Sequence, residues 1–263
     1  MTAYVSLDFS VPYLEYLLPE QLSLLNSLLL IIFAGITSAM TASIGVGGGV
    51  LLLAVMALIL PPAAIIPLHG MVQFGSNFNR AVMTFKGIDW KRLAAFTPGA
   101  ILGAGLASLF LVELPMQFLQ LTIAGFILFL TWGPKVPAIG LGRVGTFFAA
   151  LITTFVSMFA GATGPLVAAF VKQQHQGDRF RTVANFAATM SVQHLPKAVV
   201  FGAAGFVFAD WLGLMLLMVL SGAVGTWLGL KLLNKLSNQK FSRMINVVLT
   251  LLALRLIWSA LVS

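Results

Sequence analysis

The sequence predicts an all-α integral membrane protein made of two inverted repeats of about five helical segments each, with helices broken at Gly-rich motifs. The first observation is composition: 59% of the 263 residues are hydrophobic and 8% are charged, whereas a soluble domain carries about 25% charged residues. The second is that the apolar runs approach the roughly 20 residues with which a helix spans a bilayer, rather than the alternating strands of a membrane barrel. The third is a pair of Gly-rich interruptions, at residues 45–49 and 161–165.

Apolar segments follow one another along the chain, five in each half. We expect helices at 22–44, 48–60, 63–85, 93–112, 116–133, 144–161, 164–171, 182–208, 211–233 and 241–261. They divide the chain into an extracytoplasmic, interfacial segment (1–21), a first transmembrane repeat (22–133), a cytoplasmic linker (134–143) and a second, inverted repeat (144–263). The short segments 48–60 and 164–171 either cross the membrane or re-enter it as hairpins with the segments before them.

The basic residues of the connections set the expected orientation. Every second connection carries them, and the alternate connections hold Glu113 and Asp210 instead. By the positive-inside rule the basic connections are cytoplasmic, so we expect both termini on the extracytoplasmic side. Because each half has an odd number of segments, the halves enter the membrane from opposite sides. The cytoplasmic set is Lys86, Lys91, Arg92, Lys135, Arg143, Lys172, Arg179, Arg181, Lys231, Lys235, Lys240 and Arg243.

The two halves also match in sequence, most clearly at an offset of 116 residues. The matches combine glycines of the interruptions with polar residues inside apolar segments. They pair Gly45 with Gly161, Gly48 with Gly164, His69 with Asn185, Gln73 with Thr189, and Asn77 with Gln193. Interrupted helices at corresponding places of two halves are the sequence signature of a transporter's binding site.

The interruptions themselves predict an anion site. Gly costs about 1 kcal/mol and Pro about 3 kcal/mol in a helix interior, so a new helix is expected to start after each interruption. The first amides of such a helix lack partners and lie at the positive end of its dipole, where anions bind. Gly47, Gly48 and Gly49 would form one such end, and Thr163 and Gly164 the other. A Gly cluster can instead serve close helix packing, which we expect of Gly99, Gly103, Gly222, Gly225 and Gly229.

Two helical stripes of polar residues accompany the interruptions. The first consists of His69, Gln73, Asn77 and Arg80; the second of Thr182, Asn185, Thr189, Gln193 and Lys197, with His194 beside it. Spacings of three and four place each stripe on one helix face, which must turn to the protein interior or to water. We expect a substrate pathway there; the alternative is hydrogen bonding between helices. Arg80 could also extend toward the cytoplasmic surface past its apolar stem.

The charges inside the segments favour an anionic substrate. Arg80 and Lys197 lie within apolar segments, whereas every Asp and Glu is terminal or in a connection. Only His69 and His194 could there bind a coupling proton near neutral pH; each could equally be a neutral core histidine. An enzyme is not expected, because the chain has no Cys, no acid in the membrane and no recognisable Ser-nucleophile motif. We expect no cofactor and no metal site.

With its GVGGG motif at residues 45–49, its two-half organisation and its SGAVG pattern at residues 221–225, the chain resembles the sulfite exporter TauE/SafE family of membrane anion transporters. The second interruption departs from the family's usual triple-Gly pattern, with Thr163 and Pro165 where Gly is common. The resemblance implies export of sulfite, sulfonates or related sulfur oxyanions across a bacterial inner membrane.

The sequence therefore leads to a secondary transporter of small sulfur-containing anions that works by alternating access. The expected partners are the anion, the lipid bilayer and a second copy in a homodimer, with no nucleic acid. An anion channel, an uptake permease for another small anion and a subunit that docks a partner protein are the alternatives. The expected substrate-binding residues are Gly47, Gly48, Gly49, His69, Gln73, Asn77, Arg80, Thr163, Gly164, Asn185, Thr189, Gln193, His194 and Lys197.

Overall fold

The computed structural model describes residues 17–110, 115–134, 142–175, 178–233 and 238–262. Most of the expected N-terminal interfacial segment and of the expected linker lies outside these residues. The described residues form α-helices joined by short turns and two 3₁₀ helices, and they contain no strand. The all-α prediction is therefore confirmed for this part of the chain.

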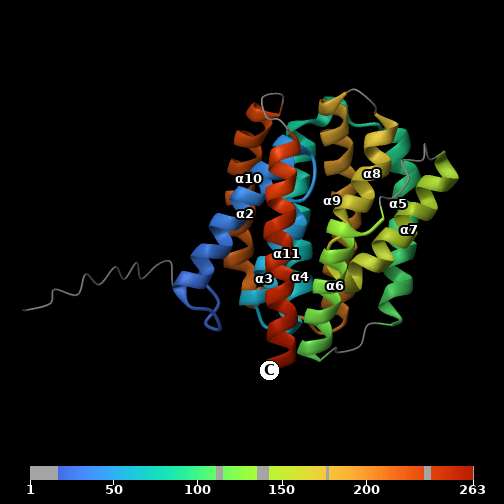
Figure 1. Ribbon diagram of the computed structural model, residues 1–263. Helices are drawn as coiled ribbons and strands as arrows, with labels where there is room; N and C mark the ends of the chain where they lie inside the picture. Colours follow the sequence, from blue (N-terminus) through green and yellow to red (C-terminus); the bar gives the residue numbers. More distant parts are fainter. Residues whose placement is uncertain (1–16, 111–114, 135–141, 176–177, 234–237, 263) are drawn as a thin grey trace, which may run out of the picture.

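Each expected segment corresponds to one helix, with ends that agree within about five residues. The structural boundaries, with the helices labelled as in Figure 1, are α2 (Leu24–Ile44), α3 (Gly48–Ile59), α4 (Pro62–Met83), α5 (Trp90–Ser108), α6 (Met116–Trp132), α7 (Arg143–Ala160), α8 (Gly164–Gln174), α9 (Arg179–Ala203), α10 (Leu212–Leu232) and α11 (Asn238–Val262). The 3₁₀ helices η1 (Phe85–Gly87) and η2 (Phe208–Trp211) precede α5 and α10.

Both Gly-rich motifs break a helix, as predicted. After α2 the backbone turns through Gly45 and Gly47, with φ of 100° and 104°, and after α7 through Gly161, with φ of 81°. These left-handed values are accessible to Gly but strained for other residues. The helices that follow are short: α3 has 12 residues and α8 has 11, lengths of about 18 Å and 16 Å at 1.5 Å per residue. Each covers about half of a ~30 Å hydrocarbon core.

Glycines bring two pairs of long helices into close contact. A Cβ on Gly225 or Gly229 of α10 would collide with backbone carbonyls of α2, and one on Gly99 or Gly103 of α5 would collide with carbonyls of α7. The carbonyls belong to Gly35 and Ala39 on α2 and to Phe147 and Leu151 on α7, while Gly222 of α10 faces the Ser76 hydroxyl of α4. The expected packing role of these glycines is confirmed.

Helix pairing follows a regular pattern across the two halves. α2 packs along α10 and α5 along α7, while α4 packs against α9 and α6 against α11. If α2–α6 are numbered one to five in the first half and α7–α11 one to five in the second, helix one of each half packs against helix four of the other. Helix three packs against helix three, and helix five against helix five. An inverted repeat would produce this pairing, although the repeat itself stays a prediction.

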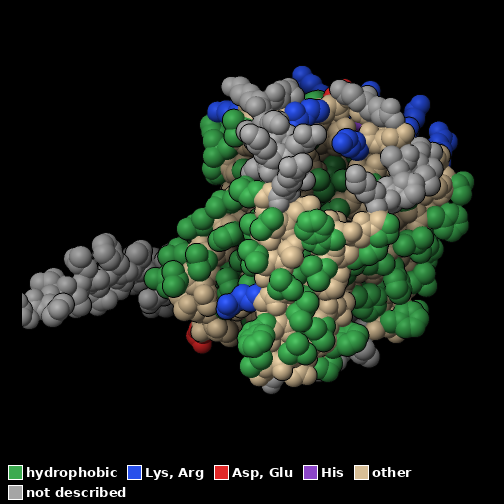
Figure 2. All heavy atoms as spheres, in the orientation of Figure 1, with side chains coloured by type: hydrophobic (Ala, Val, Ile, Leu, Met, Phe, Trp, Pro, Cys, Tyr) green, Lys and Arg blue, Asp and Glu red, His purple; other side chains and the backbone are tan. Residues whose placement is uncertain are grey.

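The outside of the bundle is largely apolar. Figure 2 shows hydrophobic side chains over its flanks and Lys and Arg side chains gathered at one end, which we call the basic end. Exposed Leu106, Val199, Leu220 and Leu254 come from four different helices. Helices long and apolar enough to cross a membrane, by length and composition, are Leu24–Ile44, Arg143–Ala160, Phe208–Leu232 and Met244–Val262. α3 is instead buried on nearly all sides, which explains its uniformly apolar sequence.

Candidate functional site

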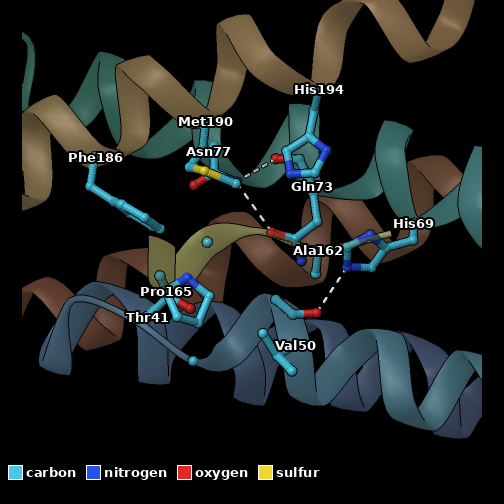
Figure 3. A pocket seen from close by; sticks show the side chains of 13 residues that line it. Thr41, Val50, His69, Gln73, Asn77, Ala162, Pro165, Phe186, Met190 and His194 are labelled. Atoms are coloured by element: carbon cyan, nitrogen blue, oxygen red, sulfur yellow. Dashed lines mark hydrogen bonds between the residues drawn. The ribbon is translucent and has the colours of Figure 1, made fainter. Parts of the chain in front are cut away.

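The two helix breaks meet at one cavity inside the bundle (Figure 3). Its lining residues come from both halves of the chain: Thr41, Gly47, Gly49, Val50, His69, Gln73, Asn77, Ala162, Gly164, Pro165, Phe186, Met190 and His194. The cavity measures about 20 Å³ for water-sized molecules, and a single water needs about 10–15 Å³ on this measure. The described conformation is therefore closed tightly around the site.

The helices that begin at the cavity have no side-chain cap, a feature they share with α4, α6, α7 and α10. Ser23, Asp89 and Asp178 cap α2, α5 and α9 by accepting hydrogen bonds from backbone amides. The corresponding residues of α3 and α8, Gly47 and Thr163, make no such bond. The first amides of α3 and the Gly164 amide of α8 are thus left without a side-chain acceptor at the positive ends of two helix dipoles. The next residues of α8 add no free donor, because Pro165 has no amide hydrogen and the Leu166 amide donates to the Thr163 carbonyl at 3.0 Å.

One wall of the cavity is polar and belongs to α4 (Figure 3). His69 lies 2.8 Å from the Gly49 carbonyl through Nε2. Asn77 donates through Nδ2 to the Gln73 carbonyl at 2.8 Å and to Gln73 Oε1 at 3.2 Å. The structure therefore brings His69, Gln73 and Asn77 to the first break, because spacings of four residues keep them on one face of α4.

Arg80 lies behind this wall and does not line the cavity. Its Nη1 donates to Asn77 Oδ1 at 3.0 Å, and its Nη2 donates to Ser38 Oγ at 3.0 Å and to Thr226 Oγ1 at 3.5 Å. The side chain is 2% exposed, so the alternative in which Arg80 extends to the cytoplasmic surface is wrong, and its expected contribution of charge to the site stays a prediction. Because the Asn77 oxygen faces Arg80, the Asn77 amide nitrogen is directed toward Gln73.

The second break is braced by side chains of its own half. Lys197 Nζ donates to the Gly161 carbonyl at 2.8 Å. Gln193 Nε2 donates to Thr163 Oγ1 at 2.6 Å, and this hydroxyl donates to the Thr153 carbonyl at 3.2 Å. Lys197, Gln193 and Thr163 are fully buried but are not among the lining residues, so they contact the break rather than the cavity.

Three expected site residues are placed elsewhere. Asn185 donates to the Gly87 carbonyl at 2.9 Å and accepts from the Asp89 amide at 2.7 Å, which ties α9 to the turn before α5. Thr189 donates to the Asn185 carbonyl. Gly48 faces α2, where a Cβ would collide with the Thr37 carbonyl.

Sequence reasoning missed the apolar lining of the cavity, which comes from α3, the second break and α9 and is called the apolar wall below. It consists of Val50, Ala162, Pro165, Phe186 and Met190, and Thr41 of α2 is a further missed lining residue. Ala162 and Pro165 could have been included, because they belong to the second motif. Phe186 and Met190 have no such signal, since apolar residues of a buried helix look alike whether they face a cavity or the core.

The cavity region carries positive charge without buried carboxylates. Arg80 and Lys197 are both buried. The described carboxylates are instead in caps or connections: Glu20 precedes α2, Asp89 and Asp178 are caps, and Asp210 is in η2. Buried charges without partners are costly, so this arrangement favours a negatively charged ligand. Among the described residues there is no cluster of three His, Asp or Glu side chains that could hold a metal ion.

A second, larger cavity lies at the end of the bundle where α4 and α10 begin. It measures about 650 Å³ and is lined by residues that include Pro61, Pro67, Met158, Phe201 and Asp210. Pro67 is two residues from His69 on α4, and Phe201 is one helical turn from Lys197 on α9. The large cavity therefore comes within one turn of the small one along α4, whereas along α9 Phe201 is seven residues, about two turns, from the lining residue His194.

The family comparison covers nearly the whole chain. The family model described as sulfite exporter TauE/SafE matches residues 11–256. The chain belongs to the TauE/SafE family. Together with its apolar helices, membership in this family of membrane transporters makes the protein a multi-pass membrane protein. No curated protein and no solved structure shows significant similarity to this TauE/SafE family member.

Proposed function

We propose that this TauE/SafE family member is a secondary transporter that exports small sulfur-containing anions, such as sulfite or organosulfonates, by alternating access. The observation that carries the proposal is that two helices without side-chain caps begin at one cavity shared by both halves. Such helix ends bind oxyanions through their free amides and dipoles. The buried cations Arg80 and Lys197 add the charge that an anion would balance.

The anion would lie between unlike walls. Gly47, Gly49 and Gly164 would supply backbone amides, and Gln73, Asn77 and His194 would supply polar side chains. The wall containing Phe186 and Met190 offers apolar contact to the organic part of a sulfonate. Four residues outside the lining would support the site. Thr163, Gln193 and Lys197 would hold the second break in place, and Arg80 would hold Asn77.

Access would alternate between the two ends of the bundle. The large cavity approaches the site from the end that holds Pro61 and Asp210, which we assign to the extracytoplasmic side by the positive-inside rule. At the basic end, Arg179 of α9 donates to the Ser43 carbonyl of α2 at 3.2 Å, joining the halves there. Rocking of one half against the other would open the basic end and close the large cavity. This orientation places both termini outside the cytoplasm, in a bacterial inner membrane.

The test is substrate-dependent stabilisation followed by exchange. The purified protein would be heated with sulfite, methanesulfonate, sulfate or chloride, because a ligand of the folded state adds about 2.7 kcal/mol at a hundredfold excess over Kd. Proteoliposomes loaded with a stabilising anion should then show saturable exchange of internal for external anion. Large, non-saturating currents would instead favour an anion channel, and no stabilisation and no flux with any of these anions would refute the assignment.

A further inference from the structure

The cavity contains a pair of histidines, which can bind a proton as well as contact an anion. The rings of His69 on α4 and His194 on α9 are 5.8 Å apart and nearly perpendicular, at 78°. Both residues line the cavity and are at most 1% exposed. They join the two central helices, one from each half of the chain.

The hydrogen bonding of His69 identifies its basic nitrogen. A carbonyl oxygen only accepts hydrogen bonds, so Nε2 at 2.8 Å from the Gly49 carbonyl carries the hydrogen in the neutral ring. The lone pair is then on Nδ1. The Nδ1 atoms of both His69 and His194 are buried without a hydrogen-bond partner, although buried polar atoms are normally paired.

We propose that His69 and His194 form a proton-binding site, and that the transporter takes up one proton together with its anion. This proposal rests on the proposed function of the same cavity. The proton would pass from water to the Nδ1 lone pair of His69 or to the unprotonated ring nitrogen of His194, and it would return to water when the anion leaves on the other side. No bond of the anion forms or breaks in this cycle.

The charged groups around the two rings explain why proton binding should depend on anion binding. Lys197 is the charged side chain that acts on both rings, and the Gly49 and Gly161 carbonyls face His69. α2 and α3 contain no charged residue, and Arg80 lies 11 residues from His69 on α4, about 16 Å along the helix. The other basic residues of the helices packed here are at helix ends: Lys91, Arg92, Arg143, Lys172, Arg179, Arg181 and Lys231.

A proton on either ring would therefore add positive charge to a buried region that holds no carboxylate. A bound anion supplies the missing negative charge and makes the protonated ring favourable. Linkage requires that the proton strengthens anion binding by the same factor. Export of the anion with a proton also reduces the charge carried across the membrane by one unit per cycle.

The test counts protons during anion binding. Methanesulfonate, which stays ionised, is titrated into the purified protein by calorimetry at one mildly acidic pH in two buffers of different ionisation enthalpy. The same titration with sulfite compares the wild type with each variant, so that protons bound by sulfite itself cancel. We expect the wild type to take up as much as one proton per anion, and His69→Gln and His194→Gln to lose that uptake while they still bind the anion more weakly.

The third histidine of the chain provides a matched control. His175 is buried at the end of α8, outside the cavity lining. Burial, with the nearby charges of Arg181 and Arg92, lowers the pKa of His175 below its ordinary value. Because His175 does not line the cavity, a bound anion would not change its charge. His175→Gln should therefore keep the wild-type proton uptake.

The outcomes separate the two proposals. Anion binding with the same heat in both buffers would overturn the proton site and leave the anion site standing. Uptake that persists in His69→Gln and in His194→Gln would overturn the assignment to these rings. If neither anion binds, the proposed function fails, and the proton site fails with it. His69→Gln disturbs the bond to the Gly49 carbonyl and could misfold. In that case His194→Gln decides the test, because Nδ1 of His194 has no hydrogen-bond partner to lose.

Discussion

The two breaks solve the same structural problem in different ways. The first break presents bare backbone: it follows Gly45 and Gly47, and the polar groups near it belong to α4. The second break is tied down by Lys197 at the Gly161 carbonyl and by Gln193 at the Thr163 hydroxyl. The comparison suggests that the first break makes most of the polar contacts with the anion, while the second holds its shape and provides an apolar surface.

The largest expected effect comes from adding a methyl group to each break. In Gly48→Ala the new Cβ would collide with the Thr37 carbonyl, whereas in Gly164→Ala it would meet Phe186 at an ordinary 3.5 Å. Overpacking costs about 1–3 kcal/mol and occasionally more. We expect Gly48→Ala to lower the melting temperature and abolish transport. Gly164→Ala, whose methyl group would lie beside the lining residues Phe186 and Met190, should keep the wild-type melting temperature and lose only part of the transport. Thermal denaturation and proteoliposome exchange measure this, and equal effects at the two sites would contradict it.

Lys197→Met tests whether the brace of the second break also supplies charge. The substitution removes the donor to the Gly161 carbonyl, and an unsatisfied buried acceptor costs about 1–3 kcal/mol. It also removes one buried positive charge near the cavity. We expect anion affinity to fall at least tenfold, measured by calorimetry with sulfite. If the affinity is unchanged, Lys197 has only a structural role.

Asn77→Ala and Gln193→Ala compare the aligned amides of the two halves. Asn77 lines the cavity, and Gln193 contacts only the break. Asn77→Ala removes the amide that holds Gln73 and Arg80 in place beside the cavity, and we expect Kd to rise tenfold or more without unfolding of the protein. Gln193→Ala should weaken transport by a smaller factor. A larger rise in Kd for Gln193→Ala than for Asn77→Ala in a binding titration would show that the second break makes most of the polar contacts with the anion.

The smallest expected effect concerns the apolar wall. Phe186 lines the cavity beside the second break, and its removal would take away contact with the organic part of a sulfonate. Phe186→Ala should reduce the affinity for methanesulfonate relative to sulfite by a few fold, as measured by competition. Equal losses for both anions would indicate that Phe186 shapes the cavity without selecting its ligand.

Much of the fold followed from local physical chemistry. The positions of the breaks follow from the conformational cost of Gly and Pro in helices, and every described α-helix corresponds to an expected apolar segment. His69, Gln73 and Asn77 were found because polar groups inside lipid must face the protein interior. Asn185 and Thr189 have the same spacing, but the structure places them toward the turn before α5.

The sequence by itself determined the membrane class, the broken helices and the excess of buried positive charge, because each depends on short-range preferences or on composition. Only the tertiary structure decided that Arg80 binds Asn77 and Ser38 instead of reaching the surface, and that Phe186 and Met190 face the anion cavity. Helical periodicity defines a face of each helix, but the neighbour of that face depends on how helices distant in sequence pack together.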